Sequence, residues 1–278
     1  MGTNTKVILI TGASSGIGKA MALALIEEGH TVYGAARRVE KMQDLVDAGG
    51  HALQLDVTNH EEVAAAVERV LTEQNRIDVL VNNAGYAVYG AIEDVPVEDA
   101  RRQFEVNLFG LAAITKAVLP AMRKQRSGTI INVTSVGGKI YTPLGAWYHA
   151  TKHALEGWSD CLRLETARFG INVVIVEPGA IETEFGDVMT GPMLDRSGDG
   201  PYAKMARAVA QAMKTSYEPG GSSPPSVIAN LVSKAIRAGR PKTRYAAGKY
   251  AKPMLAMRRW LSDRAFDGII MSQIKSMQ

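Results

Sequence analysis

The sequence has almost no cysteine, because Cys161 is the only one among its 278 residues. A single thiol cannot form an intramolecular disulfide. This excludes the disulfide-rich secreted scaffolds and is compatible with a reducing compartment. We expect Cys161 to pack in the interior of the fold. No metal site is predicted.

Long hydrophobic runs are missing as well. Apolar runs such as Val7–Ile10 and Val173–Val176 have the length of a strand and fall short of the roughly 20 residues that a membrane-spanning helix needs. Residues 1–6 lack the basic start and the apolar stretch of a secretion signal. The sequence therefore predicts no transmembrane segment and a cytoplasmic location. It also contains no internal repeat.

Net charge is small but unevenly placed. The formal net charge is +4, yet the segment from Arg237 to Gln278 holds ten Lys or Arg and two Asp, an excess of +8 that leaves −4 for the preceding residues. A basic tail can touch an anionic membrane weakly or meet an acidic partner, although a solvated basic face is more frequent. Because the tail has no recognition motif and the rest of the chain is acidic, we expect no nucleic-acid binding.

Short β-branched runs alternate with longer segments of helical periodicity, in a composition (46% hydrophobic, 22% charged) that is ordinary for a globular domain. The predicted strands are 6–10, 31–36, 51–55, 78–81, 128–133, 171–176 and 243–246. The predicted helices are 17–28, 61–73, 97–124, 147–169, 226–238 and 252–274. This order favours an α/β fold, a doubly wound parallel sheet in a single domain (1–278), with its ligand crevice at the carboxyl ends of the strands.

Two segments near the C-terminus depart from this alternation. Residues 180–225 are rich in Gly, Pro, Ser and Met, with turn signals at Gly191-Pro192, Gly200-Pro201 and Pro219-Gly220-Gly221, and we interpret them as a substrate lid. Residues 250–278 form a basic amphipathic extension. This extension can dock on the body, on a second subunit or weakly on a membrane.

A glycine-rich turn follows the first strand and leads directly into a helix. Its candidate cofactor-binding residues are Gly12, Ser14, Ser15, Gly16, Ile17 and Gly18. Such a turn brings backbone amides and the positive helix end to a pyrophosphate, although the same glycines also serve tight packing of a strand on a helix. The Gly-x3-Gly-x-Gly spacing differs from the commoner Gly-x-Gly-x-x-Gly pattern.

Arg37 and Arg38 follow the second strand, where a cofactor with a free ribose 2′-hydroxyl usually meets Asp or Glu. Paired guanidinium groups at that position bind a 2′-phosphate through charge-assisted hydrogen bonds. Two arginines on a surface turn are the alternative. Together with the glycine turn, the pair favours NADP(H) over NAD(H).

Polar residues also follow the next two strands. Asp56, beside Val57, is placed to meet an adenine amino group, or else to serve as a helix cap or turn residue. After the fourth strand, the Asn82 and Asn83 amides can bridge neighbouring backbones, while small Ala84 and Gly85 let a cofactor lie close. An Asn-rich turn is the alternative for this segment.

Tyr148 and Lys152 are four residues apart in a predicted helix, so their side chains emerge on one face. A free tyrosine is a poor acid or base at neutral pH, but a nearby lysine cation stabilises the phenolate and lowers its pKa. Ser135 follows the fifth strand and can donate its hydroxyl to a carbonyl oxygen. A Tyr-x-x-x-Lys pair alone also occurs on solvated helix faces.

Taken together, the motifs resemble the short-chain dehydrogenase/reductase family in order and spacing. They are Thr11–Gly18, Asn82–Gly85, Asn107, Ser135, Tyr148-x-x-x-Lys152 and Pro178-Gly179. The resemblance implies a Rossmann-type sheet of seven strands and a catalytic tetrad of Asn107, Ser135, Tyr148 and Lys152. In that tetrad Tyr148 would transfer the proton, Ser135 would polarise the carbonyl, Lys152 would lower the tyrosine pKa and bind the nicotinamide ribose, and Asn107 would hold a water.

The resemblance also assigns the rest of the cofactor site and the assembly. Pro178, Gly179, Ile181 and Thr183 would cradle the nicotinamide, and Asn83, Ala84 and Gly85 would line the adenosine side. The family usually pairs subunits through the helices that carry Asn107 and Tyr148, which implies a homodimer or homotetramer. The long C-terminus resembles that of hydroxysteroid- and retinol-type dehydrogenases.

For the substrate, the candidate residues are Ser135, Tyr141, Leu144, Tyr148, Phe185 and Met189. Most are apolar or flexible, and Met side chains adapt to irregular shapes. We therefore expect an NADP(H)-dependent oxidoreductase acting on a lipophilic aldehyde, ketone or alcohol, such as a steroid or retinoid. An NADP-binding sensor without turnover is the alternative, which the intact tetrad disfavours.

Overall fold

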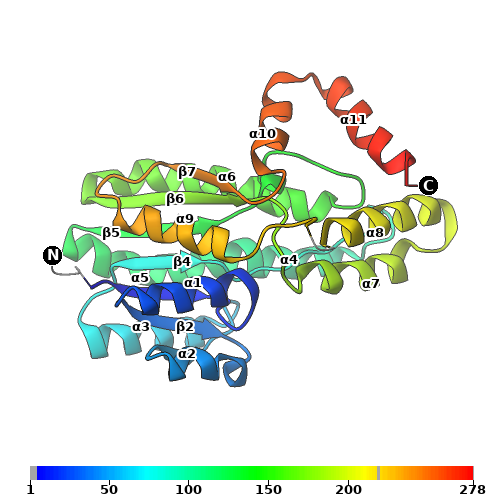
Figure 1. Cartoon of the computed structure of the whole chain (residues 1–278). Coiled ribbons are helices and arrows are strands. Elements are labelled where there is room, and N and C mark those ends of the chain that lie inside the picture. Colours follow the sequence, from blue (N-terminus) through cyan, green and yellow to red (C-terminus); the bar gives the residue numbers. More distant parts are fainter. Residues whose placement is uncertain (1–4, 218–219, 278) are drawn as a thin grey trace.

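The computed structural model describes residues 5–217 and 220–277, of which residues 185–188 and 217 are described by their backbone only. A seven-stranded parallel sheet of order β3-β2-β1-β4-β5-β6-β7 forms its centre (Figure 1). The strands are β1 Val7–Thr11, β2 Thr31–Ala36, β3 His51–Gln54, β4 Val79–Asn82, β5 Gly128–Val133, β6 Ile171–Pro178 and β7 Arg244–Ala247.

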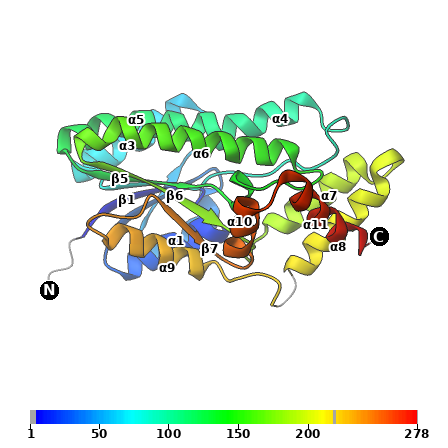
Figure 2. The same ribbon diagram turned by 90° about the horizontal axis from the view of Figure 1, so that it is seen from above.

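Helices cover both faces of the sheet, as Figure 2 shows. One layer contains α3 His60–Gln74, α4 Val97–Phe104, α5 Leu111–Gln125 and α6 Ala146–Thr166; the other contains α1 Gly16–Glu27, α2 Gln43–Asp47 and α9 Ser226–Arg237. Each layer buries its own cluster of aliphatic side chains against the strands. These are the two apolar interfaces that an α/β sheet needs, and together they confirm the expected Rossmann-type architecture.

The strand order reverses direction between β1 and β4, because the chain adds β2 and β3 on one side and β4 to β7 on the other. At such a switch point the loops after the two central strands diverge and leave a crevice at the carboxyl edge of the sheet. The glycine-rich turn after β1 and the Asn-rich segment after β4 both lie there.

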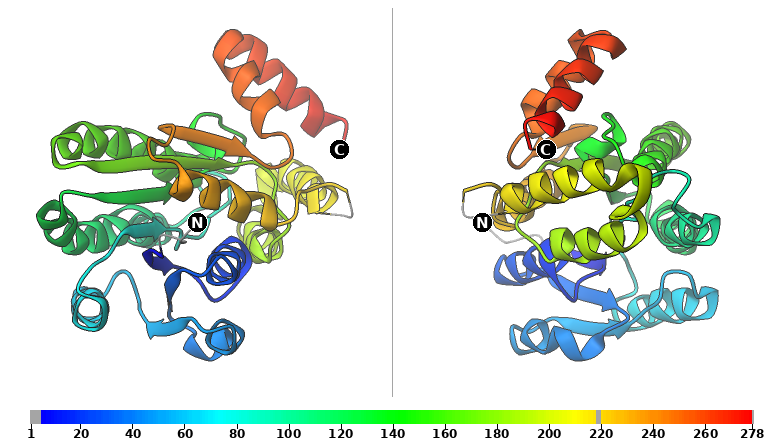
Figure 3. Two further views of the ribbon diagram at one scale, coloured as in Figure 1. Left: turned by 60° about the vertical axis from the view of Figure 1, so that its left-hand side comes forward. Right: turned by 90° about the vertical axis from the view of Figure 1, so that its right-hand side faces the viewer.

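Four helices near the C-terminus form a cap beside the carboxyl edge of the sheet. They are α7 Phe185–Ser197, α8 Ala203–Tyr217, α10 Ala251–Trp260 and α11 Asp263–Lys275. Figure 3 shows α10 and α11 as a hairpin that projects from the sheet, and α8 packs against both α7 and α11. The cap is held by a third apolar cluster, which contains seven of the chain's 12 methionines.

Several expectations about local structure are wrong. Gly191-Pro192 is not a turn, because it lies inside α7, whereas Gly200 does start a turn with φ +79°. The predicted helix 252–274 is broken in two, with Leu261 extended at φ −94°, ψ 145° before α11 begins. Helix α2, only five residues long, was not predicted.

Cys161 is exposed on α6 rather than packed in the interior. Its position on the helix faces away from the sheet, and the apolar residues of α6 that meet the core lie on other positions, such as Leu155 and Leu162. The one stretch of the described residues long and apolar enough to cross a membrane is Val97–Gln125. It comprises α4, the segment 105–110 and α5, in one of the two helix layers that cover the sheet (Figure 2).

Candidate active site

The glycine-rich turn after β1 is a place where only glycine fits. Gly12 and Gly16 have φ values of +70° and +53°, in the left-handed region that favours glycine. At Gly18 an added Cβ would lie 2.2 Å from the carbonyl oxygen of Gly12. The turn therefore brings the backbone of α1 directly against the end of β1.

The start of α1 offers an anion its full positive end. Ser15 is the N-cap residue but makes no side-chain cap hydrogen bond, and the first turn of α1 has no acidic residue. Uncapped N–H groups and the helix dipole together favour a bound anion. The turn thus fits the pyrophosphate of a dinucleotide on both steric and electrostatic grounds.

Asn83 ties the end of β4 to this turn. Its Nδ2 donates to the carbonyl oxygens of Thr11 and Gly12, at 3.1 and 3.2 Å. In return, Thr11 Oγ1 accepts from the backbone N–H groups of Asn83 and Ala84, both at 3.1 Å. The two strand ends on either side of the crevice are therefore fixed to each other.

Asn82 plays a different part from Asn83. It is 2% exposed, and its Nδ2 donates to Thr115 Oγ1 and Asn132 Oδ1, both at 2.9 Å. These contacts join β4 to α5 and β5 inside the core. Of the two neighbouring asparagines, the structure brings only Asn83 to the glycine turn.

Arg37 and Arg38 lie just after β2 and are both exposed. Neither guanidinium makes a hydrogen bond or ion pair with any of the residues that the structure describes, so both are available to an anion. Asp56, after β3, instead accepts hydrogen bonds at Oδ1 from Thr58 N and Thr58 Oγ1, at 3.0 and 2.8 Å. Partial burial acts to raise the pKa of Asp56, but these bonds and the charge of Arg37 outweigh it and lower the pKa.

Asp56 thus stabilises the turn that enters α3 through Oδ1, while its other oxygen has no hydrogen bond to the described residues. Val57, next to it, packs against the helical segment after α4: a Cβ on Gly110 would lie 2.8 Å from the Val57 carbonyl oxygen.

Ser135 and Tyr148 converge on the backbone of Gly137. A Cβ built on Gly137 would lie 3.1 Å from Tyr148 Cε1 and 3.3 Å from Ser135 Oγ. Ser135 Oγ accepts a hydrogen bond of 3.0 Å from Gly137 N, and both side chains are 8% exposed. The short helical turn at 136–138, which follows β5, thus brings the two hydroxyl-bearing residues to one place.

Lys152 lies one helical turn from Tyr148 and is 8% exposed. Its Nζ donates to the Val133 carbonyl oxygen at 3.0 Å and lies 6.0 Å from the centre of the Tyr148 ring. Burial lowers the pKa of Lys152 to about 8, against the opposing charge of Glu156. The ammonium group is thus held under the ring, desolvated and close to the point where it changes charge.

Asn107 lies in a π-helical turn, Glu105–Gly110, that interrupts the long predicted helix between α4 and α5. Its Oδ1 accepts from Tyr86 N at 3.0 Å, and its Nδ2 donates to Tyr86 O at 2.9 Å and to Thr151 Oγ1 at 3.2 Å. Turns of this type often mark functional sites. Asn107 thereby joins the segment after Gly85 to the helix that carries Tyr148 and Lys152.

The residues after β6 cover the crevice from the other side. Gly179 packs against the segment after β7, where an added Cβ would lie 2.2 Å from Lys249 O. Thr183 reaches the glycine turn, because a Cβ on Gly16 would lie 3.1 Å from Thr183 Cγ2. Pro178 ends β6, and Ile181 is buried in the core cluster of α1 and α9.

Three of the expected substrate residues share one apolar cluster, in which Leu144 and Met189 pack with Tyr148. Tyr141 lies at its margin, where its hydroxyl donates to Asp267 Oδ1 of α11 at 3.0 Å and its ring meets Phe266 edge-on. Phe185 begins α7, but its side chain lies outside the described residues. The cluster therefore links Tyr148 to the cap.

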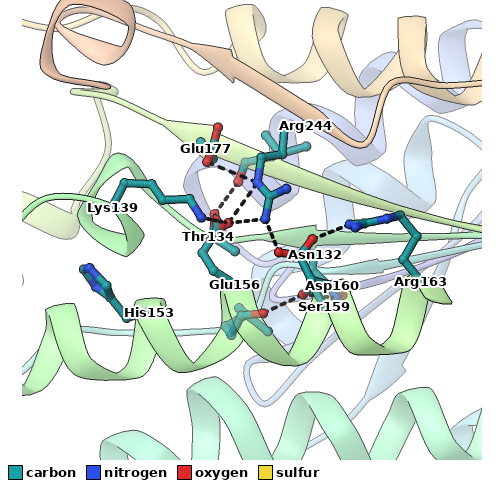
Figure 4. A network of polar contacts seen from close by, with 12 residues as sticks. Asn132, Thr134, Lys139, His153, Glu156, Ser159, Asp160, Arg163, Glu177 and Arg244 are labelled. Atoms are coloured by element: carbon teal, nitrogen blue, oxygen red, sulfur yellow. Dashed lines mark hydrogen bonds and ion pairs between the residues drawn. The ribbon is translucent and has the colours of Figure 1, made fainter. Parts of the chain in front are cut away.

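Sequence reasoning missed a polar network behind the site, which Figure 4 shows. Glu156 is 3% exposed; its Oε1 accepts from Thr134 Oγ1, and its Oε2 pairs with Lys139 and Arg244 at 2.9 and 3.0 Å. Burial, with the charge of Glu156, raises the pKa of neighbouring Glu177 to about 6. The only signal in the sequence was Glu156, on the same helix face as Lys152.

The chain belongs to the short-chain dehydrogenase family, whose model matches residues 6–190. It is therefore an oxidoreductase of short-chain dehydrogenase type. It is 46% identical over 182 residues, 66% of each chain, to a 3-ketodihydrosphingosine reductase of Bacteroides thetaiotaomicron. Over 281 residues, 97% of each chain, it is 32% identical to an NADPH-dependent 3-dehydrocapnine reductase of Ornithobacterium rhinotracheale.

Solved structures agree with this assignment. A short-chain dehydrogenase from Streptomyces avermitilis is 36% identical and superposes with a TM-score of 0.83, over 99% of this chain and 100% of that one. A serine dehydrogenase in complex with NADP+ is 30% identical, with a TM-score of 0.73 over 87% and 94% of the two chains. The Rossmann-type fold is thus shared along nearly the whole length.

Proposed function

We propose that residues 1–278 form one oxidoreductase domain that transfers hydride between NADP(H) and a lipophilic carbonyl or alcohol substrate. The observation that carries this proposal is the convergence of Ser135 and Tyr148 at Gly137, with Lys152 held under the tyrosine ring. This cluster lies at the carboxyl edge of the sheet that also carries the uncapped start of α1.

In this mechanism Tyr148 donates its phenolic proton to the carbonyl oxygen during reduction and takes it back during oxidation. Ser135 donates a hydrogen bond to the same oxygen and polarises the carbonyl. The buried Lys152 cation stabilises the phenolate electrostatically, which brings a group of ordinary pKa near 10 into a useful range. The nicotinamide supplies the hydride chemistry when bound.

The remaining residues hold the cofactor. Gly12, Gly16 and Gly18 let the backbone approach the pyrophosphate, and Arg37 and Arg38 bind a ribose 2′-phosphate, which discriminates NADP(H) from NAD(H). The unpaired state of both arginines supports this preference, as does the NADPH dependence stated for the relative from Ornithobacterium. Asp56 and Asn83 lie on the adenosine side, and Pro178, Ile181 and Thr183 on the nicotinamide side.

For the substrate we propose a ketone or alcohol on a long apolar chain. Two relatives are reductases of 3-ketodihydrosphingosine and 3-dehydrocapnine. The apolar cluster that joins Tyr148 to the cap is rich in methionine, and such side chains adapt to a flexible chain. Steroid and retinoid carbonyls are the other members of this lipophilic class, and small polar alcohols are the contrast.

We further propose a cytoplasmic homodimer or homotetramer, with weak contact between the basic C-terminal segment and anionic membranes. Trp260 is 79% exposed at the end of α10, and the Arg259 guanidinium lies 5.6 Å from its ring centre. A sensor that binds NADP without turnover has no specific observation in its favour.

The test is a fluorescence titration with NADPH and NADH, followed by turnover on matched substrates. The panel contains long-chain 3-ketones, retinal, steroid ketones and small polar ketones. We expect tighter binding of NADPH and fastest turnover of a long-chain ketone. Fastest turnover of the small polar ketones contradicts the substrate proposal, and tight NADPH binding without any turnover points to the sensor.

A further inference from the structure

His149 is a buried histidine beside Tyr148 that the proposed mechanism does not use. It is 6% exposed, and both ring nitrogens have partners in residues 137–145. Nδ1 lies 2.9 Å from Gly137 O, and Nε2 lies 3.1 Å from Thr142 N and 3.0 Å from Thr142 Oγ1. Because a backbone N–H can only donate and a carbonyl can only accept, these contacts define a neutral imidazole with its proton on Nδ1.

Gly137 is the residue through which His149 reaches the site. Its carbonyl accepts from His149, its N–H donates to Ser135 Oγ, and a Cβ added to it would lie close to both Ser135 and Tyr148. A Cβ on Gly137 would also lie 3.1 Å from His149 Nδ1. The imidazole thus contacts the carbonyl of the same residue whose N–H binds Ser135 Oγ, one peptide unit further along the chain.

The two ends of this loop are held separately by Glu156, two turns further along α6. Thr134, before Ser135, donates to Glu156 Oε1 at 2.7 Å, and Lys139, after the 136–138 turn, pairs with Oε2 (Figure 4). The segment 134–139 is therefore attached to α6 at both ends by Glu156 and at its apex by His149. Tyr148 and Lys152 lie on the same helix. Tyr148 directly precedes His149, and Lys152 lies between His149 and Glu156.

We propose that His149 is a positioning residue, whose neutral imidazole holds the apex of the segment 134–139 so that the Ser135 and Tyr148 hydroxyls reach one carbonyl oxygen. This inference rests on the proposed function. Protonation makes Nε2 a donor that faces the N–H of Thr142, so that contact is lost in acid.

Burial supports the neutral form, because it lowers the pKa of His149 against the opposing hydrogen bond to Gly137 O. Among the described residues, four titratable or charged groups lie near the imidazole. Tyr89 meets it at Gly145, where an added Cβ would lie 2.8 Å from His149 Nε2 and 3.0 Å from Tyr89 Cε1. His153, one turn on in α6, also lowers the pKa, Tyr148 packs edge-on at 5.7 Å between ring centres, and Lys139 of the loop is paired with Glu156.

The test compares His149→Leu, which removes both contacts, with His149→Gln, which keeps a neutral acceptor near Nε2 but cannot titrate. His60→Gln, at an exposed histidine that begins α3, is the control. A misplacement of about 1 Å can cost about 100-fold in rate, so we expect His149→Leu to lower kcat by about 10- to 100-fold. NADPH binding should stay within about twofold of wild type, because the glycine turn and both arginines are untouched.

The pH profile separates positioning from mere packing. We expect kcat of the wild type and of His60→Gln to fall in acid, and His149→Gln to keep partial activity without that acid limb. Wild-type kcat in His149→Leu, or an unchanged acid limb in His149→Gln, overturns the proposal. If His149→Leu does not fold, the His149→Gln profile decides.

A second readout needs no turnover. Nitrogen-15 resonances of the histidines in the wild-type chain should show His149 neutral at pH 7 with the proton on Nδ1. An imidazolium, or a proton on Nε2, overturns the proposal at once. If the wild type turns over no substrate at all, the proposed function fails. The tautomer of His149 still tells whether its contacts with Gly137 and Thr142 exist.

Discussion

The carboxyl edge of the sheet and the cap are built in opposite ways. At the edge, Asn107, His149 and Lys152 are each fixed by a directional hydrogen bond to a backbone carbonyl oxygen. The cap is held mainly by an apolar cluster around Phe266 and seven methionines. Its polar contacts join α7 to residues 89–99, through Arg196 and Ser197, and α11 to Tyr141. Directional bonds restrict the positions of these side chains, whereas methionine packing tolerates rearrangement.

This difference indicates that the two regions serve different steps, proton transfer at the edge and substrate binding at the cap. Proton transfer requires one geometry, which a satisfied network of buried polar groups supplies. Binding of flexible apolar chains requires a surface that adapts, which polarizable unbranched side chains supply. The following variants are expected to affect one region while sparing the other.

The largest effect is expected for Tyr148→Phe, which removes the proton donor from the edge and leaves the cap intact. General acid catalysis contributes about 10²- to 10⁴-fold, so kcat for carbonyl reduction should fall by at least that range. NADPH binding, measured by fluorescence, should persist. Turnover within about tenfold of wild type would show that another group transfers the proton.

Phe266→Ala is the matching change in the cap. Phe266 is fully buried, and its loss should cost about 3–5 kcal/mol of unfolding free energy. Because α11 is attached through this cluster, we expect hydrogen exchange to quicken in α8 and α11 while the strands stay protected, and KM for a long-chain ketone to rise more than kcat falls. Exposed Trp260→Ala is the control. Uniform loss of protection across the sheet would show that cap and edge unfold together.

The double variant Arg37→Ala, Arg38→Ala should act on cofactor choice alone. Each lost charge-assisted hydrogen bond is worth about 1.5–3 kcal/mol, so NADPH should bind at least about tenfold more weakly while NADH is unaffected. Arg240→Ala, a surface arginine remote from β2 in the sequence, serves as the control. Equal weakening for both cofactors would assign the arginines to general attraction rather than to the 2′-phosphate.

The sequence predicted the edge far better than the cap. Glycines with positive φ, Asn83 and the Tyr148-Lys152 pair follow strands or share a helix face, so local pattern and spacing place them. The position of Tyr141 against Asp267 depends on a contact across 126 residues that no local pattern encodes. Pro192 inside α7 and the π-helical turn at Asn107 break propensity rules where tertiary packing decides.

Lys152→Met tests whether the buried charge of Lys152 destabilises the carboxyl edge of the sheet. Burial lowers the pKa of Lys152 from 10.5 to about 8, so the folded chain carries a disfavoured charge below pH 8, and wild-type stability should rise as pH increases from about 8 toward 10.5. Replacing the ammonium by an apolar group of similar length removes that cost. We expect Lys152→Met to raise the melting temperature by a few degrees at pH 7, with a smaller gain at pH 10, and to abolish turnover.

Thermal unfolding at the two pH values, with exposed Lys252→Met as the control, measures this. A gain that is equal at both values, or larger at pH 10, would mean that the Val133 carbonyl and Glu156 compensate the buried charge fully.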